Sequence, residues 1–134
     1  MIVARFEKDD ERKRVTLRVK GHADFAPKGL DIICASSSIL SYALAQHFKF
    51  LSNNTTEYYQ NPRIKMKSGD AIVSARARTM QGYGTLLNSC FLTYSGFLLL
   101  ASNYPSLVAV EGFLDAMEED EEGNDQPSDT TPEA

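Results

Sequence analysis

One short segment of this 134-residue chain holds both a histidine and a cysteine. Residues 21–40 read GHADFAPKGLDIICASSSIL, which places His22 and Cys34 on either side of a short loop. A thiolate is a strong nucleophile, and a neighbouring imidazole can take the thiol proton and later return it to a leaving group. If the loop brings the two together, they supply the nucleophile and the base of an acyl-transfer site.

The position of Cys34 at the start of a predicted helix favours the same chemistry. Asp31 is a residue type that commonly caps helices, and Cys34 is the third residue after it. Unpaired backbone N–H groups and the helix dipole stabilise negative charge at such a position. The same N–H groups are candidates to stabilise the oxyanion of an attacked carbonyl.

These residues also have plain structural explanations. A cysteine early in a helix is usually a small buried apolar residue, and a histidine at a strand end is often a surface or capping group. Asp31 either orients His22 as a third catalytic member or only caps the helix, and its position favours the cap. Ser38, one turn beyond Cys34, either hydrogen-bonds in the site or bonds back to its own helix.

Apolar periodicity predicts the elements that must position the pair. Two alternating runs, 1–8 and 15–21, predict an antiparallel hairpin, and a helix is expected from the Asp31 cap to about residue 51. The predicted elements that follow are strands at 56–67 and 71–78 around a turn at 68–70, a helix at 81–103 and a strand at 107–113. The order ββαββαβ predicts an α+β domain with two helices packed on one mainly antiparallel sheet.

Helical spacing also predicts which faces of the helices are buried. In the first helix the apolar set is Ile32, Ala35, Ile39, Leu40, Ala43, Leu44, Phe48 and Leu51. In the second helix it is Leu86, Leu87, Cys90, Phe91, Tyr94, Phe97, Leu98 and Ala101, which makes Cys90 a core residue.

The charges divide the chain into two unequal parts. Residues 1–78 hold 14 basic and 8 acidic residues, whereas the rest holds 10 acids and no base. Eight of those acids lie within 118–134, which has no apolar residue larger than Ala. We therefore expect one domain at 1–117 and a disordered acidic tail at 118–134.

The cysteine content and the lack of targeting segments favour a reducing compartment. No secretion signal is visible, and no uninterrupted apolar run is long enough to span a bilayer. Cys34 and Cys90 are far apart and do not form a metal-type pair. We expect a cytoplasmic protein with free thiols, no membrane partner, no metal and no other cofactor.

The segment around the histidine and the cysteine resembles the signature of the ribosomal-processing cysteine protease (Prp) family. That signature is Gly-His-Ala, a loop, and then Gly-x-Asp-Ile-x-Cys-Ala-x-x-Ser-x-Leu. It is matched by Gly21, His22, Ala23, Gly29, Asp31, Ile32, Cys34, Ala35, Ser38 and Leu40. The family's ββαββαβ order covers the chain from Met1 to about Phe113.

The resemblance implies a specific activity. Cys34 is expected to be the nucleophile and His22 the general base and acid. The expected substrate is the precursor of large-subunit ribosomal protein L twenty-seven, whose short N-terminal extension ends in an aromatic residue before the cut. Family members are homodimers, so a homodimer is expected.

The loop after His22 is the expected substrate-binding loop. It includes Asp24, Phe25, Lys28 and Gly29, and the part from Asp24 to Lys28 is a candidate lid that closes on substrate. Phe25 either contacts the aromatic residue of the substrate or anchors the loop by packing. Gly21 and Gly29 are expected to permit tight backbone at the two ends of the loop.

Basic residues at polar strand positions suggest a rival function. They are Arg5, Arg14, Arg18, Lys20, Lys65, Lys67, Arg76 and Arg78. We expect a solvated sheet face without direct RNA binding, although this face is where ribosomal RNA would dock. The acidic tail either folds back over this face or mimics nucleic acid. The rival functions are a non-enzymatic ribosome-associated binding module and a redox sensor that uses Cys90 as its resolving thiol.

Overall fold

The computed structural model describes residues 1–24, 26–27 and 31–112, and within them it confirms the predicted order of elements. The elements are β1 (Ile2–Asp9), β2 (Arg14–Lys20), α1 (Ile32–Asn54), β3 (Arg63–Lys67), β4 (Asp70–Arg76), α2 (Met80–Asn103) and β5 (Val108–Gly112). The predicted tail at 118–134 and the last residue of the predicted final strand, Phe113, lie outside the described residues.

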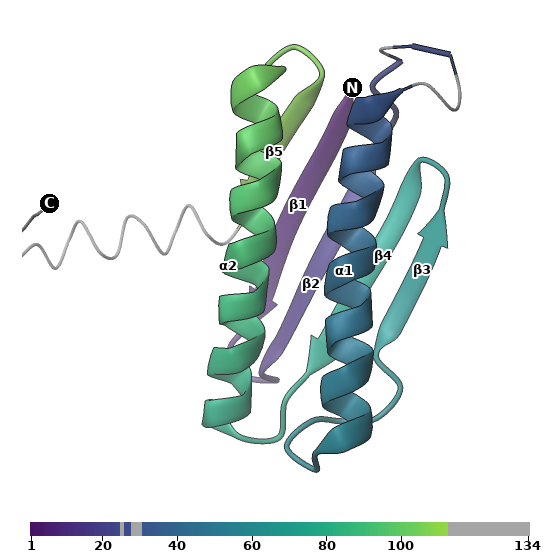
Figure 1. The fold of residues 1–134 in the computed structure, drawn as a ribbon. Helices are drawn as coiled ribbons and strands as arrows, with labels where there is room; N and C mark the ends of the chain where they lie inside the picture. Colours follow the sequence, from purple (N-terminus) through teal and green to yellow (C-terminus); the bar gives the residue numbers. More distant parts are fainter. Residues whose placement is uncertain (25, 28–30, 113–134) are drawn as a thin grey trace, which may run out of the picture.

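The five strands form one mixed sheet in the order β3-β4-β2-β1-β5. The pairs β1–β2, β2–β4 and β3–β4 are antiparallel, and β1–β5 is parallel. Both helices cover the same face of the sheet (Figure 1). The predicted α+β class, with two helices on a mainly antiparallel sheet, is therefore confirmed.

The core lies between the sheet and the two helices. Phe6 of β1 is fully buried, and its ring makes edge-on contacts with Tyr94 and Phe97 of α2, at centroid distances of 5.7 and 6.2 Å. Phe48 of α1 is also fully buried. Burial of aromatic rings of this size is a large part of the driving force for folding.

The predicted buried face of α1 is partly wrong. Ile32 and Ile39 are 58% and 65% exposed, and Ala35 and Ala43 are exposed as well. The buried residues of α1 are Ile33, Ser37, Ser41, Leu44, Ala45, Phe48 and Ser52. Serines can occupy this face because a hydroxyl can bond to its own helix, as Ser41 does by donating to the Ser37 carbonyl at 3.0 Å.

The predicted apolar stripe of α2 is buried at its centre but partly exposed at its edges. Leu86, Cys90 and Phe97 have no exposed surface, whereas Phe91 and Leu98 are 45% and 43% exposed. By length and composition α2 could also cross a membrane, and it is the one helix of the described chain that meets those criteria. A helix that buries one side against a sheet passes the same test.

The first strand of the second hairpin, β3, is shorter than predicted. β3 begins only at Arg63, directly after Pro62, where the sequence predicted a strand start or a bulge. Before it, Tyr58 makes a single bridge to Ala77, and Tyr59 donates its N–H to the Arg76 carbonyl at 3.0 Å. This places the Tyr58–Tyr59 segment against the end of β4.

Candidate active site

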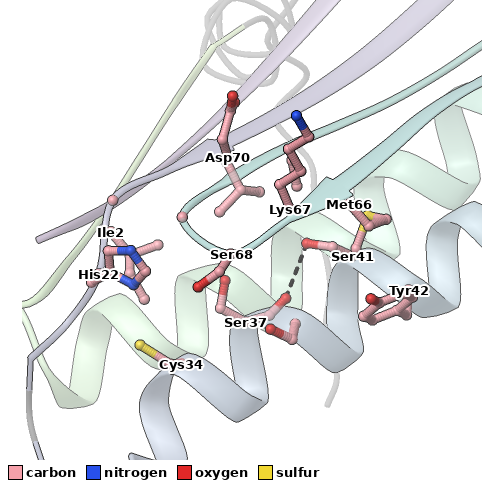
Figure 2. A pocket seen from close by; sticks show the side chains of 15 residues that line it. Ile2, His22, Cys34, Ser37, Ser41, Tyr42, Met66, Lys67, Ser68 and Asp70 are labelled. Carbon is pink, nitrogen blue, oxygen red and sulfur yellow. Dashed lines mark hydrogen bonds between the residues drawn. The ribbon is translucent and has the colours of Figure 1, made fainter. Parts of the chain in front are cut away.

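His22 and Cys34 line one pocket of about 280 Å³ (Figure 2). Its walls come from the end of β2, the first turns of α1 and the turn between β3 and β4. Besides the pair, the pocket is lined by Ile2, Val19, Gly21, Ser37, Ser38, Ser41, Tyr42, Met66, Lys67, Ser68, Gly69, Asp70 and Ala71. The fold thus brings the predicted nucleophile and base to the same cavity.

Asp31 has the geometry of a helix cap. Its backbone is extended, and its Oδ1 accepts hydrogen bonds from the N–H groups of Ile33 and Cys34, both at 3.0 Å. Within the described chain no hydrogen bond or ion pair joins its side chain to His22. The structure therefore favours the capping interpretation over the orienting one.

The same cap limits which N–H groups at the helix start can stabilise an oxyanion. The N–H groups of Ile33 and Cys34 are taken by the Asp31 carboxylate, and Ala35 donates to the Asp31 carbonyl at 3.1 Å. These three groups at the helix start are therefore already paired. A donor that does point at the reacting atom is the Ala23 N–H, which lies 3.5 Å from the Cys34 sulfur.

Cys34 is accessible at the start of α1. Its side chain is only partly buried, so a substrate can reach it, and it lies in the first turn of the helix. The Ala23 N–H faces its sulfur at 3.5 Å. Its thiol is free, with no disulfide to Cys90.

His22 is fixed from two sides by backbone contacts. The nitrogen of Met1 donates to the His22 carbonyl at 2.7 Å, and the Gly21 N–H donates to the Gly69 carbonyl at 3.0 Å. Gly21 has a φ of +100°, and a Cβ there would lie 2.0 Å from the Met1 carbonyl oxygen. The expectation that Gly21 permits tight backbone is confirmed.

The turn between β3 and β4 contributes residues that the sequence did not assign to the site. A Cβ at Gly69 would lie 2.4 Å from Nε2 of His22, so the imidazole packs directly on this glycine. Asp70 accepts a hydrogen bond from Lys65 at 2.9 Å, which lowers the pKa of the Asp70 carboxyl and keeps it ionised. Only the strand register, which pairs Lys20 with Asp70, reveals this neighbourhood, since it sets the turn beside Gly21.

The remaining predicted site residues have mixed outcomes. Ser38 is exposed and lines the pocket, and its role stays a prediction. Asp24 is exposed and has a φ of +54°, a backbone region that few non-glycine residues adopt. Phe25, Lys28 and Gly29 lie outside the described residues, so the expected lid is not tested.

Cys90 is a core residue, as predicted. It has no exposed surface, and burial raises the pKa of its thiol to about 12. A thiol that stays protonated and inaccessible is a poor resolving partner, which argues against the redox-sensor interpretation. No group of three or more histidines, cysteines and carboxylates suited to a metal ion occurs in the described part of the chain.

Solved structures of low sequence identity share this fold. The ribosomal processing protease Prp from S. aureus, in complex with a covalently linked product peptide, is 19% identical with a TM-score of 0.62, over 84% of this chain and 99% of that one. The same protease with a substrate peptide is 19% identical with a TM-score of 0.58, over 84% and 99%. SMU.848 from Streptococcus mutans is 21% identical with a TM-score of 0.57, over 84% and 93%.

A family model carries the comparison from fold to family. A search of curated proteins gave no significant match. The model of the cysteine protease Prp family matches residues 1–109, which is most of the chain and includes every residue that lines the pocket. This protein therefore belongs to the cysteine protease Prp family.

Proposed function

We propose that this cysteine protease removes the short N-terminal extension of the precursor of ribosomal protein L twenty-seven. The reaction takes place in the cytoplasm and supports ribosome assembly. The observation that carries the proposal is the meeting of His22 and Cys34 in one pocket, with Cys34 in the first turn of a capped helix. The S. aureus relatives, which hold a substrate peptide and a covalently linked product peptide, support a peptide as the substrate class.

In the proposed mechanism His22 and Cys34 act in successive steps. His22 takes the proton of the Cys34 thiol, and the sulfur attacks the carbonyl carbon of the scissile bond. The imidazolium then gives its proton to the leaving amine, which leaves a thioester on Cys34. Water, deprotonated by His22, attacks that thioester and releases the new carboxyl end of the extension.

The Ala23 N–H is our candidate donor to the oxyanion. It faces the sulfur at 3.5 Å before attack. When the carbonyl carbon bonds to the sulfur, the developing oxyanion lies within one bond length of that carbon, close to the same N–H. Removing one such donor typically costs about 3–4 kcal/mol of transition-state stabilisation.

The pocket beside the pair fits the aromatic residue that precedes the cut. Tyr42 and Met66 line its far part from two different elements, α1 and β3, and can contact an aromatic ring. Ser37 and Ser41 of α1 line the same pocket. We assign the recognition of the aromatic residue to this part of the pocket.

We also propose that the protein is a homodimer. The described helices expose large apolar side chains away from the sheet, among them Ile39 on α1 and Leu92 and Leu99 on α2, which are 65%, 76% and 65% exposed. Leu92 and Leu99 are seven residues apart and so lie on one face of α2. Exposed apolar side chains that gather on one face are typical of protein interfaces. Sedimentation of the intact chain beside Leu92→Glu tests it, since the variant is expected to sediment as a monomer if this surface forms the dimer.

Cleavage of a synthetic peptide that spans the extension tests the proposed function. The intact chain is expected to cut one bond after the aromatic residue, and Cys34→Ala and His22→Ala are expected not to cut. His47→Ala is the matched control, because His47 is the other histidine of the chain and is exposed elsewhere on α1. If no form of the protein cuts the peptide, the ribosome-associated binding module becomes the better interpretation.

A further inference from the structure

A second hollow lies on the face of the sheet that the helices leave open. We call it the arginine groove, and define it by Arg14, Arg18, Arg63 and Arg76 together with Tyr59. It has a volume of about 360 Å³, and none of its lining residues is acidic. The groove residues of β2, Arg14, Thr16 and Arg18, alternate with Val15 and Leu17, which are 0% and 1% exposed. Successive residues of a strand point to opposite faces of the sheet, so the groove lies on the face opposite the core.

The arginines of the groove are only partly paired. Arg18 makes an ion pair with Glu7 at 3.1 Å. Arg76 donates to the Arg12 carbonyl at 2.9 Å and holds its guanidinium 4.4 Å from the Tyr59 ring centre. Arg14 and Arg63 have no ion-pair partner among the described residues.

Hydrogen bonds between the strands hold the residues at the base of the groove in place. The hydroxyls of Thr16 and Ser74 hydrogen-bond to each other at 2.8 Å between β2 and β4, and Ser74 donates to the Val15 carbonyl at 2.9 Å. Tyr59 is held between two cations, since Arg78 lies 4.0 Å from its ring centre. Several guanidinium groups on a rigid surface repel one another, and a row of carboxylates or phosphates relieves that repulsion.

The same chain carries a polyanion of matching charge. Residues 118–122 are Glu, Glu, Asp, Glu and Glu, and they lie beyond the last strand. Five carboxylates in a row suit a groove that crosses three strands better than a single small anion does. Guanidinium and carboxylate groups form bidentate hydrogen bonds, which are the strong form of this contact.

The strand register places the start of this acidic run within reach. Gly112, the last residue of β5, pairs with Phe6 of β1, and β1 runs on to Asp9, which pairs with Arg14. One strand separates β5 from β2, so the lateral gap is about 10 Å. The six residues from 113 to 118 can span about 20 Å when extended, so Glu118 can reach Arg14.

We propose that residues 118–122 bind in the arginine groove of the same molecule, through ion pairs with Arg14, Arg63 and Arg76. Binding within one chain requires no partner. The short tether also favours it, because it holds the acidic segment at an effective concentration of about the millimolar order. The docked segment neutralises the groove and excludes other polyanions, RNA above all, from this face. The proposal is independent of the catalytic assignment, since the groove shares no residue with the pocket of Cys34 and His22.

Paramagnetic broadening in the full-length chain tests the proposal. A nitroxide is attached at Asn124→Cys in a Cys34→Ala background, where Cys90 is too buried to react. The amide signals of Thr16, Tyr59 and Arg63 are expected to lose intensity, and that of Gln46, on the exposed side of α1, is expected to keep it. The loss is expected to disappear in about 0.5 M NaCl, where charge interactions are screened within a few ångströms.

Charge-matched variants show whether the groove itself binds the segment. Arg14→Gln with Arg63→Gln is expected to abolish the broadening at Thr16 and Tyr59, and Lys20→Gln with Lys49→Gln, which removes the same charge elsewhere, is expected to preserve it. Broadening that is absent from the groove, or that survives the arginine substitutions, overturns the proposal. If it is absent and a twelve-nucleotide uridine RNA shifts the Thr16 and Arg63 amides of the full-length chain, the groove is a nucleic-acid site instead.

Discussion

The imidazole of His22 rests on Gly69, in the turn between β3 and β4, with no room for a side chain between them. A Cβ at position 69 would lie 2.4 Å from Nε2 and 3.0 Å from Cε1 of His22. The turn also accepts the Gly21 N–H at 3.0 Å, so it fixes the backbone that precedes the histidine. The orientation of the proposed base is therefore set by a hairpin that lies nearly fifty residues away in sequence.

Gly69→Ala is expected to displace the imidazole and to lower kcat of peptide cleavage strongly. Gly69 has a φ of +77°, so the substitution also strains the turn and is expected to cost at least about 1 kcal/mol of folding free energy. Steady-state kinetics at a temperature where the variant is fully folded separates the two effects.

Gly84→Ala is the matched control for that experiment. A Cβ at this helical position meets nothing within 4 Å, and alanine favours a helix by about 1 kcal/mol over glycine. The control should therefore be as active as the parent protein and slightly more stable. Unchanged activity in Gly69→Ala would show that the contact with His22 has no part in catalysis.

Asp31→Asn separates the capping interpretation from the orienting one. Asparagine keeps an oxygen that can accept from Ile33 and Cys34 but removes the negative charge. If Asp31 only caps α1, this variant retains most of its kcat/KM, whereas Asp31→Ala loses about 1 kcal/mol of stability. A large loss of kcat in Asp31→Asn, with unchanged stability, would instead assign an electrostatic role to the carboxylate.

The loss of the Ala23 N–H tests the proposed oxyanion donor. Replacing Ala23 by lactic acid turns its amide into an ester and removes only the N–H, and Cys34 itself offers a junction for chemical ligation of the two segments. The ester protein is expected to lose roughly a hundredfold in kcat with little change in KM. Equal kcat values for the amide and ester proteins would mean that another group binds the oxyanion.

Burial of Cys90 predicts a loss of stability at alkaline pH. The pKa of its thiol is raised from 9.0 to about 12, so the folded protein holds this proton more tightly than the unfolded chain does. Stability from this group is complete below pH 9 and falls as the pH rises toward 12, by up to about 1.4 kcal/mol per pH unit.

Urea denaturation at pH 8 and pH 10.5 measures that loss. In Cys90→Val the fall in unfolding free energy between the two pH values is expected to be smaller than in the parent protein. Tyr83, whose pKa is also raised by burial and by its hydrogen bond to Asp10, contributes in the same direction in both proteins. An identical fall in Cys90→Val and the parent would rule out the thiol as a source.

The sequence predicted the elements well because their signals are local. Alternation in β1 and β2, the Asp31 cap and the break at Pro62 each depend on a few neighbouring residues, and each was found where it was expected. The short motif from Gly21 to Leu40 likewise contains both His22 and Cys34, so the amino-acid sequence is enough to single out the pair.

The features that the sequence did not predict all depend on contacts between distant segments. Helical spacing alone did not show that Ile39 faces outward while Ser41 is buried, because the buried face of α1 is set by the sheet beneath it. Gly69 gave no sign of its contact with His22, since only the β2–β4 register brings the two together. Arg63 was not among the basic residues first singled out, and its place in the same groove as Arg14 comes from the order of the strands.

The most direct test of the central claim is to trap the thioester on Cys34. The protein is mixed with the extension peptide, quenched in acid within the first turnover and analysed by intact-mass spectrometry and peptide mapping. We predict one adduct that adds the mass of the cleaved extension less one water, attached at Cys34, and much slower adduct formation in His22→Ala. An adduct at another residue, or full cleavage by Cys34→Ala, would contradict the assignment of this pair.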